Sequence, residues 1–290
     1  MRGLKAFLQL IRPKQWTKNL VVFAGLVFSA NLFDAAKLLQ VLQLFVIFCL
    51  AAGVVYIFND WRDMPGDRLH PQKKNRPLAS KAISPRAAVT GAFVLLAISL
   101  AWSAALSPLM LGVVLLYLGL NAAYSLGLKH AVLLDVFTVT AGFVLRAAAG
   151  AWLIQVPISS WLLIVTTLLS LFLGFAKRRH ELLVLGEKAT QHRRSLGEYS
   201  AQLLDQIMGV VASATIIAYC LYAATSATAQ DYRSLMLTVP FVLYGVLRYL
   251  YLVYQKNQGG APEMILLRDR PMIVAILLWV LTVGLILYLK

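Results

Sequence analysis

The sequence predicts an all-α integral membrane protein, and three observations support this fold class. Hydrophobic residues make up 60% of the 290 residues, and only 13% of the residues are charged. A water-soluble domain carries about 25% charged residues, so this chain has too few polar side chains to cover a soluble globule. The apolar residues also form continuous runs, without the alternation of period two that a β-barrel requires. We therefore expect a single polytopic membrane domain over residues 1–290.

The segment before the first apolar run is predicted to lie along the membrane surface. Within residues 1–18, Leu4, Phe7, Leu8 and Ile11 recur at helical spacing, and basic residues stand between them. This pattern is typical of an amphipathic interfacial helix and not of a cleaved signal peptide, which needs an uninterrupted apolar core.

Nine apolar runs follow, and each is close to the length of about 20 residues that a helix needs to cross a bilayer. The sequence therefore predicts nine transmembrane helices, near residues 19–34, 38–58, 87–106, 108–126, 132–154, 160–176, 203–226, 234–254 and 271–289.

The distribution of Lys and Arg predicts the orientation of these spans. The chain has 27 Lys and Arg against 12 Asp and Glu. Most of the basic residues fall before the first span or in the loops 59–86, 127–131, 177–202 and 255–270, which nine spans place on one side. The positive-inside rule makes this side cytoplasmic, with the N-terminus inside and the C-terminus outside. For a membrane protein, a net charge of +15 favours anionic lipids or phosphorylated substrates as partners, and not nucleic acid.

An acidic motif at the end of the second predicted span is the sharpest feature. Asn59 and Asp60 are followed by Asp63 and Asp67, and spacings of three and seven residues return to one helix face. Pro65-Gly66 could end this helix, but several carboxylates would still crowd at the membrane surface. Oxygen ligands without His or Cys select a hard ion such as Mg²⁺, which usually shares its shell with substrate phosphates. The alternative is a solvated helix end whose acids pair with nearby arginines.

Basic residues near this motif are candidates for phosphate binding. Lys73 and Arg76 lie in a stretch that its prolines keep from forming a helix, and Arg can grip phosphate oxygens in bidentate fashion. Lys14 and Lys18 stand at the entry to the first span. The alternative for all four is charge placed by the positive-inside bias or by snorkelling to the interface.

The pattern Asn-Asp-x-x-Asp-x-x-x-Asp over 59–67, followed by Arg-Pro-Leu-Ala-Ser over 76–80, resembles the UbiA superfamily of intramembrane prenyltransferases. The resemblance implies a UbiA-like bundle whose cytoplasmic polar loops cap a central cavity. It also implies that Asn59, Asp60, Asp63 and Asp67 hold Mg²⁺ on a diphosphate, and that the three aspartates are catalytic.

The chain departs from the usual pattern of this superfamily after the sixth predicted span. Typical members carry a second aspartate-rich motif there, whereas this chain reads Lys-Arg-Arg-His-Glu over 177–181. In this exchange the chain resembles the branch of decaprenyl-phosphate phosphoribosyltransferases. It also resembles that branch in three further motifs, Arg-Pro-Lys-Gln-Trp-x-Lys-Asn over 12–19, Tyr-Ser-Leu-Gly-Leu-Lys over 124–129 and the segment 134–146. That branch transfers 5-phosphoribose from phosphoribosyl pyrophosphate to decaprenyl phosphate in the bacterial cell (inner) membrane, for decaprenylphosphoryl-arabinose and envelope polysaccharide.

The resemblance also implies roles for individual residues. The donor would contact Lys14, Lys18, Asn59, Lys73, Arg76, Tyr124 and Lys129. The lipid phosphate would contact Arg146, Lys177, Arg178, Arg193 and Arg194. Arg146 falls inside an apolar run, where a cation normally faces a polar cavity. A structural pair with Asp135, three helical turns earlier, is the alternative for Arg146. For Tyr124 and Lys129 the alternative is an aromatic belt and a positive-inside lysine.

Two other functions remain open at the level of sequence. An aromatic prenyltransferase of quinone or haem biosynthesis would share the fold, but the basic replacement of the second acidic motif speaks against it. A non-enzymatic carrier of anionic lipid would suit the basic loops, but not an acidic cluster confined to one side, because a carrier needs its site reachable from both faces.

Overall fold

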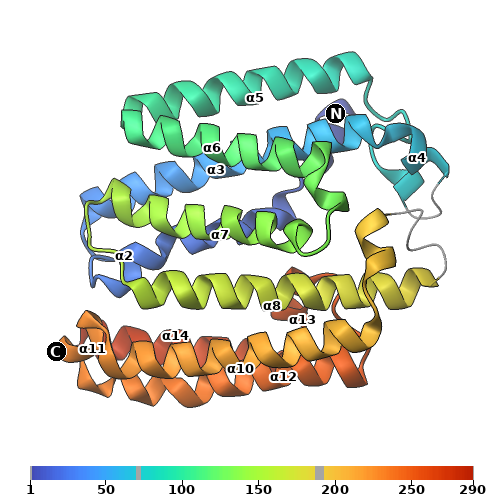
Figure 1. Ribbon diagram of the computed structural model, residues 1–290. Coiled ribbons are helices and arrows are strands. Elements are labelled where there is room, and N and C mark those ends of the chain that lie inside the picture. Colours follow the sequence, from blue (N-terminus) through green and yellow to red (C-terminus); the bar gives the residue numbers. More distant parts are fainter. Residues whose placement is uncertain (1, 70–72, 187–192, 290) are drawn as a thin grey trace.

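A computed structural model describes residues 2–69, 73–186 and 193–289, and the regular elements in these ranges are all helices, joined by turns and irregular segments. Within these ranges, eight helices are long and apolar enough to cross a membrane, which makes this a multi-pass membrane protein. They lie side by side in one bundle (Figure 1). Their bounds are α3 (Ala35–Arg62), α5 (Pro85–Leu106), α6 (Pro108–Leu126), α7 (Leu134–Leu153), α8 (Ser160–Leu185), α10 (Ala201–Thr225), α12 (Val239–Gln255, preceded by the 3-10 helix η6, Arg233–Thr238) and α14 (Arg270–Tyr288).

Side-chain caps fix where several of these helices begin. Asp34 accepts hydrogen bonds from the backbone N–H groups of Ala36 and Lys37 at the start of α3. Ser84, Ser107, Ser200 and Asp269 cap α5, α6, α10 and α14 in the same way. Each cap satisfies a backbone donor that the helix itself cannot pair.

The first predicted span differs from the expectation, so the count of nine transmembrane helices is not confirmed. In place of one α-helix over 19–34, the chain forms the 3-10 helix η1 (Pro13–Phe23) and the short helix α2 (Ala24–Phe28). Lys14, Gln15, Lys18 and Asn19 make the first half of this segment polar. It is held by close backbone packing on α7, where an added Cβ on Gly150 would collide with the carbonyl oxygen of Val22.

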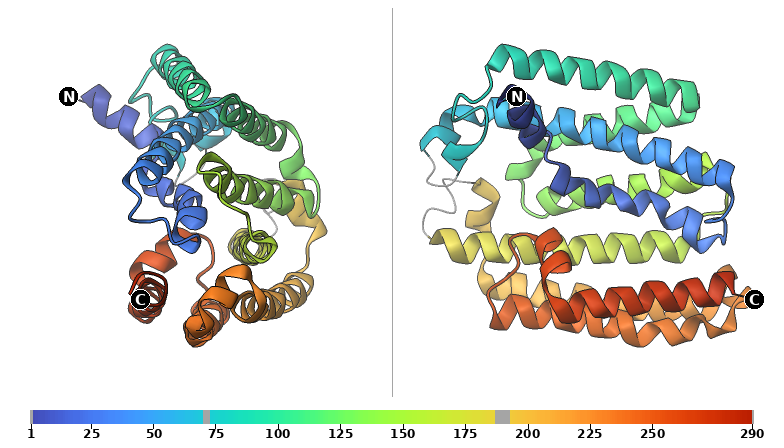
Figure 2. Two further views of the ribbon diagram at one scale, coloured as in Figure 1. Left: turned by 90° about the vertical axis from the view of Figure 1, so that its left-hand side faces the viewer. Right: turned by 180° about the vertical axis from the view of Figure 1, so that it is seen from behind.

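The hydrophobic core has two main parts that meet at α7. One part packs η1 and α2 with α3, α6 and the C-terminal half of α7, around side chains such as Leu44, Phe48 and Met110. The other packs α8, α10 and α12 against Val136 at the start of α7, around Phe172 and Leu204. Helix α7 therefore lies between the two halves of the bundle, and Figure 2 shows it near the centre when the bundle is viewed along its length.

Several short connecting elements, among them α4 (Met64–Leu69), gather at one end of the bundle, which we call the polar end (Figure 1). It holds the C-terminal ends of α3, α6 and α8 and the start of α7 (Figure 1). The helix α1 (Arg2–Leu10) also lies toward this end, whereas α11 (Ala227–Asp231) and the last described residues lie at the opposite end (Figure 1). The remaining short elements are η2 (Lys73–Asn75), η3 (Leu128–His130), η5 (Arg194–Glu198) and α13 (Pro262–Arg268). The predicted loops 59–86 and 177–202 lie partly outside the described residues.

Candidate functional site

The acidic motif lies at the polar end, where α3 stops and α4 begins. Asp60 is 2% exposed and Asp67 is 4% exposed. Nη1 of Arg76 lies 3.1 Å from Oδ1 of Asp60 and 2.7 Å from Oδ2 of Asp67, so the two carboxylates share one guanidinium nitrogen. Nη2 of Arg12 lies 2.5 Å from the same oxygen of Asp60. The predicted clustering of Asp60 and Asp67 is therefore present, with two arginines supplying the compensating charge.

The role of Arg12 was missed by sequence reasoning. The backbone of Arg12 is left-handed, with φ of 51°, between α1 and η1. Its guanidinium also lies 5.1 Å from the centre of the Tyr56 ring. Arg12 and Asp60 are 48 residues apart in the chain, and the sequence offers no signal for a pairing of this range.

The other two members of the motif face α6 and the turn that follows it. Oδ1 of Asn59 lies 2.5 Å from Oγ of Ser125, and Arg62 donates to the carbonyl oxygen of Ser125. The carboxylate of Asp63 lies 3.5 Å from Nζ of Lys129, and the Asp63 side chain is 44% exposed. Of the three aspartates, Asp63 is therefore the one that solvent or a ligand reaches most readily.

The donor chemistry of this motif suits Mg²⁺, because carboxylate and amide oxygens are the ligands that a hard cation takes. Within the described residues, however, no three acidic, His or Cys side chains are gathered as a metal site. The cationic groups of Arg12, Arg76 and Lys129 lie against the carboxylates instead. The predicted ligands Asn59, Asp60, Asp63 and Asp67 therefore fit the ion in their chemistry, and their role as ligands stays a prediction.

The basic segment on α8 forms a second cluster, built around Arg178. This side chain is buried, and Nε lies 2.6 Å from Oδ2 of Asp135. Nη1 lies 2.6 Å from Oε2 of Glu181, and Nη2 lies 3.3 Å from the hydroxyl oxygen of Tyr124. Arg178 thus joins α8 to the start of α7 and the end of α6.

The segment 193–199 packs onto the same cluster. Nη1 of Arg193 lies 2.9 Å from the Tyr124 hydroxyl and 3.4 Å from Oδ2 of Asp135. The hydroxyl of Tyr199 lies 3.1 Å from Oδ1 of Asp135 and accepts a hydrogen bond from the backbone N–H of Leu133. Burial, which is the main cause, raises the pKa of Tyr199 to about 12, so its hydroxyl remains a donor.

The acidic motif and the basic cluster are adjacent. Burial, and then the charge of Arg76, lower the pKa of Lys73, while Asp67, Asp63 and Glu181 act in the opposite direction. Lys73 therefore interacts electrostatically with carboxylates of both clusters. The turn after α6 links them as well, because Lys129 faces Asp63 while its carbonyl oxygen accepts a hydrogen bond from Ser195.

Several predicted residues lie nearer the surface of the polar end. Lys14 and Arg194 are exposed, and Lys18 and Lys177 are partly buried. Burial lowers the pKa of His130, and the charges of Lys129, Arg193 and Arg194 lower it further. This end of the molecule therefore concentrates positive charge beside the turn 127–131.

Arg146 is not brought to either cluster. It is 8% exposed, and its guanidinium donates to the Tyr117 hydroxyl at 2.8 Å and to the Gly142 carbonyl at 3.1 Å. The rings of Tyr117 and Phe143 flank it at 4.6 and 5.1 Å. It lies about 16 Å deeper than Asp135, given a rise of about 1.5 Å per residue. The alternative pairing of Arg146 with Asp135 is wrong, because Asp135 bonds to Arg178 and to the segment 193–199.

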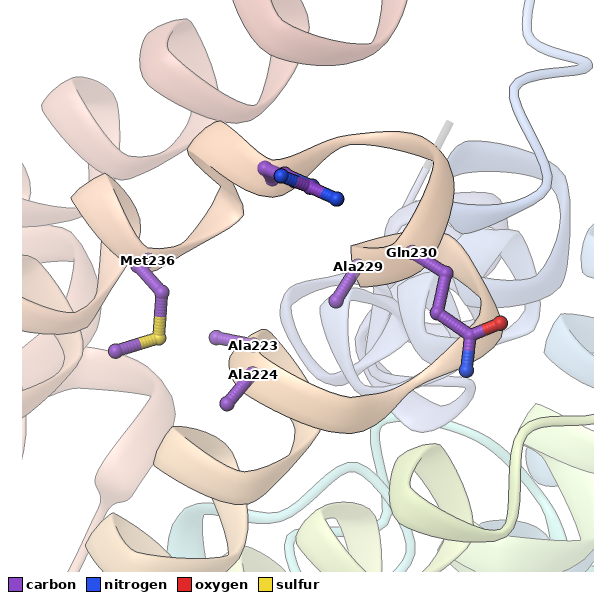
Figure 3. A pocket seen from close by; sticks show the side chains of 6 residues that line it. Ala223, Ala224, Ala229, Gln230 and Met236 are labelled. Atoms are coloured by element: carbon purple, nitrogen blue, oxygen red, sulfur yellow. The ribbon is translucent and has the colours of Figure 1, made fainter.

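A pocket at the end opposite the polar end contains none of the predicted site residues. As Figure 3 shows, it opens between α10, α11 and the 3-10 helix η6 that follows. Its lining is formed by Ala223, Ala224, Ala229, Gln230, Arg233 and Met236. It has no acid or nucleophile, and the candidate site is therefore the polar end.

Comparisons with known proteins agree on one family. The sequence profile of the UbiA prenyltransferase family matches residues 19–268. The decaprenyl-phosphate phosphoribosyltransferase of Mycolicibacterium smegmatis is 34% identical, over 98% of this chain and 93% of that protein. The protein of the same name from Corynebacterium glutamicum is 33% identical, over 96% of this chain and 86% of that protein.

Solved structures show the same fold. A UbiA homolog from Archaeoglobus fulgidus bound to GPP and Mg²⁺ has a TM-score of 0.75 and 18% identity, and the match covers 97% of this chain and 99% of that chain. A UbiA homolog from Aeropyrum pernix K1 has a TM-score of 0.61 and 15% identity, covering 96% of this chain and 98% of that chain.

Proposed function

This chain belongs to the UbiA prenyltransferase family, and from this premise we propose that it transfers 5-phosphoribose from phosphoribosyl pyrophosphate to decaprenyl phosphate, releasing pyrophosphate. The observation that carries the proposal is its likeness, over nearly the whole length of both chains, to relatives named decaprenyl-phosphate phosphoribosyltransferase. The polar end is consistent with it. An acidic motif suited to a metal-bound diphosphate lies beside a guanidinium cluster suited to a second phosphate.

The acidic motif is the proposed site of the donor's diphosphate. Asn59, Asp60, Asp63 and Asp67 would hold Mg²⁺, which when bound neutralises charge on the leaving pyrophosphate. The side chains of Lys73 and Arg76 lie at this motif and can bind phosphate oxygens, because both are cationic donors. We place Lys14, Lys18 and Lys129 around the same donor.

The reaction exchanges one bond at the anomeric carbon. The bond to the pyrophosphate oxygen breaks, and a bond to an oxygen of the lipid phosphate forms, through a sugar with oxocarbenium-like character. A phosphate monoester is already anionic near neutral pH, so the attacking oxygen needs no general base. Residues of the polar end then act by holding the two anions in place and by balancing their charge.

The basic cluster is the proposed site of the lipid phosphate. Arg194 is its exposed cation and Lys177 is partly buried, while Arg178 and Arg193 are held by ion pairs with Asp135. Tyr124, which the resemblance assigns to the donor, contacts both of these arginines, and we therefore place its hydroxyl on the lipid-phosphate side. Arg146 has its described contacts deeper in the membrane, so a role toward this phosphate rests on the resemblance alone.

We propose that the polar end faces the cytoplasm of a bacterial cell and that the C-terminus lies outside. Residues 13–28 would make a ninth crossing of the membrane, because eleven residues of 3-10 helix and five of α-helix extend about 30 Å, the thickness of the hydrocarbon core. A cytoplasmic site would receive a water-soluble sugar phosphate directly. The product would then serve decaprenylphosphoryl-arabinose and envelope polysaccharide synthesis.

The requirement for Mg²⁺ and for both substrates tests this function. Purified protein in detergent is expected to release pyrophosphate only when phosphoribosyl pyrophosphate, decaprenyl phosphate and Mg²⁺ are all present. Excess EDTA should lower the rate of pyrophosphate release at least a hundredfold, and added Mg²⁺ should restore it. Release that needs a prenyl diphosphate and an aromatic acceptor would favour the aromatic prenyltransferase, and lipid movement between leaflets without release would favour a carrier.

A further inference from the structure

The carboxylate of Asp135 is the centre of a buried network that the proposed reaction does not itself require. Asp135 is fully buried, with 0% of its surface exposed. Nε of Arg178 and Nη1 of Arg193 donate to Oδ2, at 2.6 and 3.4 Å, and the hydroxyl of Tyr199 donates to Oδ1 at 3.1 Å. Oγ of Ser195 lies 3.4 Å from Oδ2. One side chain at the start of α7 therefore holds α8 and the segment 193–199 together.

The charges of this network balance among its buried and partly buried members. Arg178 and Arg193 carry two positive charges, and Asp135 and Glu181 carry two negative charges. Asp135 also stands in the first turn of α7, where the helix dipole favours a carboxylate. Loss of its charge would leave the buried guanidinium of Arg178 and the partly buried guanidinium of Arg193 facing one carboxylate, and their positions would no longer be fixed.

The two arginines converge on one atom, the hydroxyl oxygen of Tyr124. This oxygen accepts a hydrogen bond from Arg178 at 3.3 Å and from Arg193 at 2.9 Å. With both of these bonds made, the phenolic hydrogen is directed away from the arginines. Within the described parts of the chain, the contacts of Tyr124 include no acceptor for that hydrogen, and its side chain is partly exposed.

We infer that Asp135 is a positioning residue, which through Arg178 and Arg193 orients the Tyr124 hydroxyl as a hydrogen-bond donor to the lipid phosphate. The two guanidinium groups polarise the phenol toward donation, and a phosphate oxygen is the strongest acceptor expected at this site. This inference rests on the proposed function, because it concerns how the acceptor of that reaction is held.

Steady-state kinetics of matched variants tests the inference. Both Asp135→Asn and Tyr124→Phe are expected to raise KM for decaprenyl phosphate about tenfold and to change KM for phosphoribosyl pyrophosphate less than twofold. The double variant should have the same KM for decaprenyl phosphate as the single variants, because each substitution removes the same hydrogen bond from the Tyr124 hydroxyl to the lipid phosphate. Additive effects, or equal increases in both KM values, would overturn the inference, since a general loss of packing would affect both substrates.

Asp205→Asn is the matched control. Asp205 forms an ion pair with Arg179, the residue next to Arg178 on α8, and Arg179 also packs on Tyr254. This variant removes an ion pair from the same turn of α8, one whose carboxylate is more exposed than that of Asp135, and it does not touch Tyr124. Both KM values should stay within twofold of the wild type. An increase in KM for decaprenyl phosphate equal to that of Asp135→Asn would show a merely structural effect and would contradict the inference.

Ligand-induced thermal stabilisation gives a readout that needs no turnover. Decaprenyl phosphate should raise the unfolding temperature of the wild type and of Asp205→Asn, and this shift should be lost in Asp135→Asn. If Asp135→Asn does not fold, Ser195→Ala replaces it. This variant is expected to raise KM for decaprenyl phosphate about threefold, and an unchanged KM would contradict the inference. A wild type that releases no pyrophosphate from the two substrates instead contradicts the proposed function itself.

Discussion

Changing Asp63 to Asn will reduce pyrophosphate release at least a thousandfold while leaving the protein folded. The carboxylate of Asp63 is 44% exposed and has a cation 3.5 Å away, so its loss disturbs little of the packing. In its proposed role as a ligand, Asp63 supplies charge that holds Mg²⁺ on the leaving group, so its loss would weaken Mg²⁺ binding. A thousandfold change corresponds to about 4 kcal/mol of transition-state stabilisation. The rate is measured in detergent with both substrates saturating and with Mg²⁺ present.

Asp231→Asn is the control for this variant, because Asp231 is an exposed acid in α11 at the opposite end of the bundle. It should retain wild-type activity and the wild-type unfolding temperature. If Asp63→Asn keeps more than a tenth of the wild-type rate, the acidic motif does not hold a metal that the reaction needs.

Changing Arg76 to Gln will lower both activity and stability. Arg76 joins the buried carboxylates of Asp60 and Asp67, and without it Arg12 is the remaining cation on Asp60. Breaking a buried ion pair costs about 3–5 kcal/mol, and we expect the lower end because the Arg76 side chain is 27% exposed. Thermal unfolding in detergent measures the loss, and pyrophosphate release should fall at least a hundredfold.

Mg²⁺ gives this prediction a second readout. Because a bound divalent ion would neutralise Asp60 and Asp67 in place of Arg76, millimolar Mg²⁺ should stabilise Arg76→Gln more than it stabilises the wild type. Arg86→Gln, which removes an exposed arginine at the start of α5, should behave as the wild type. An equal response to Mg²⁺ in all three proteins would show that the ion does not bind at these carboxylates.

The long apolar helices could be predicted from the sequence because a membrane demands a continuous apolar run. The second predicted span, 38–58, corresponds to α3, which the structure extends to Ala35–Arg62. The extension carries Asn59 and Asp60 on the same helix as the span, as the helical spacing of the acidic motif predicts. The first span could not be predicted in this way, since residues 13–28 are held by close packing of backbones at Gly25 and Gly150, which apolarity does not reveal.

The composition of the candidate site could be predicted, but its pairing could not. The acidic motif and the basic segment on α8 are both visible in the sequence as charge patterns beside apolar runs. Their partners come from other helices, as in the contact of Arg12 with Asp60 and that of Asp135 with Arg178, 43 residues apart. Helical spacing suggested Arg146 as the partner of Asp135, because spacing within one helix cannot show what a neighbouring helix offers.

The identity of the lipid product tests the central claim most directly. Purified protein is incubated with Mg²⁺, decaprenyl phosphate and phosphoribosyl pyrophosphate labelled in the ribose, and the extracted lipid is analysed by mass spectrometry. Our account predicts a labelled lipid that is heavier than decaprenyl phosphate by one phosphoribosyl group, absent with Asp63→Asn. Decaprenyl phosphate left unmodified by the folded wild type, or a prenylated aromatic product when a prenyl diphosphate and an aromatic acceptor are supplied, would contradict it.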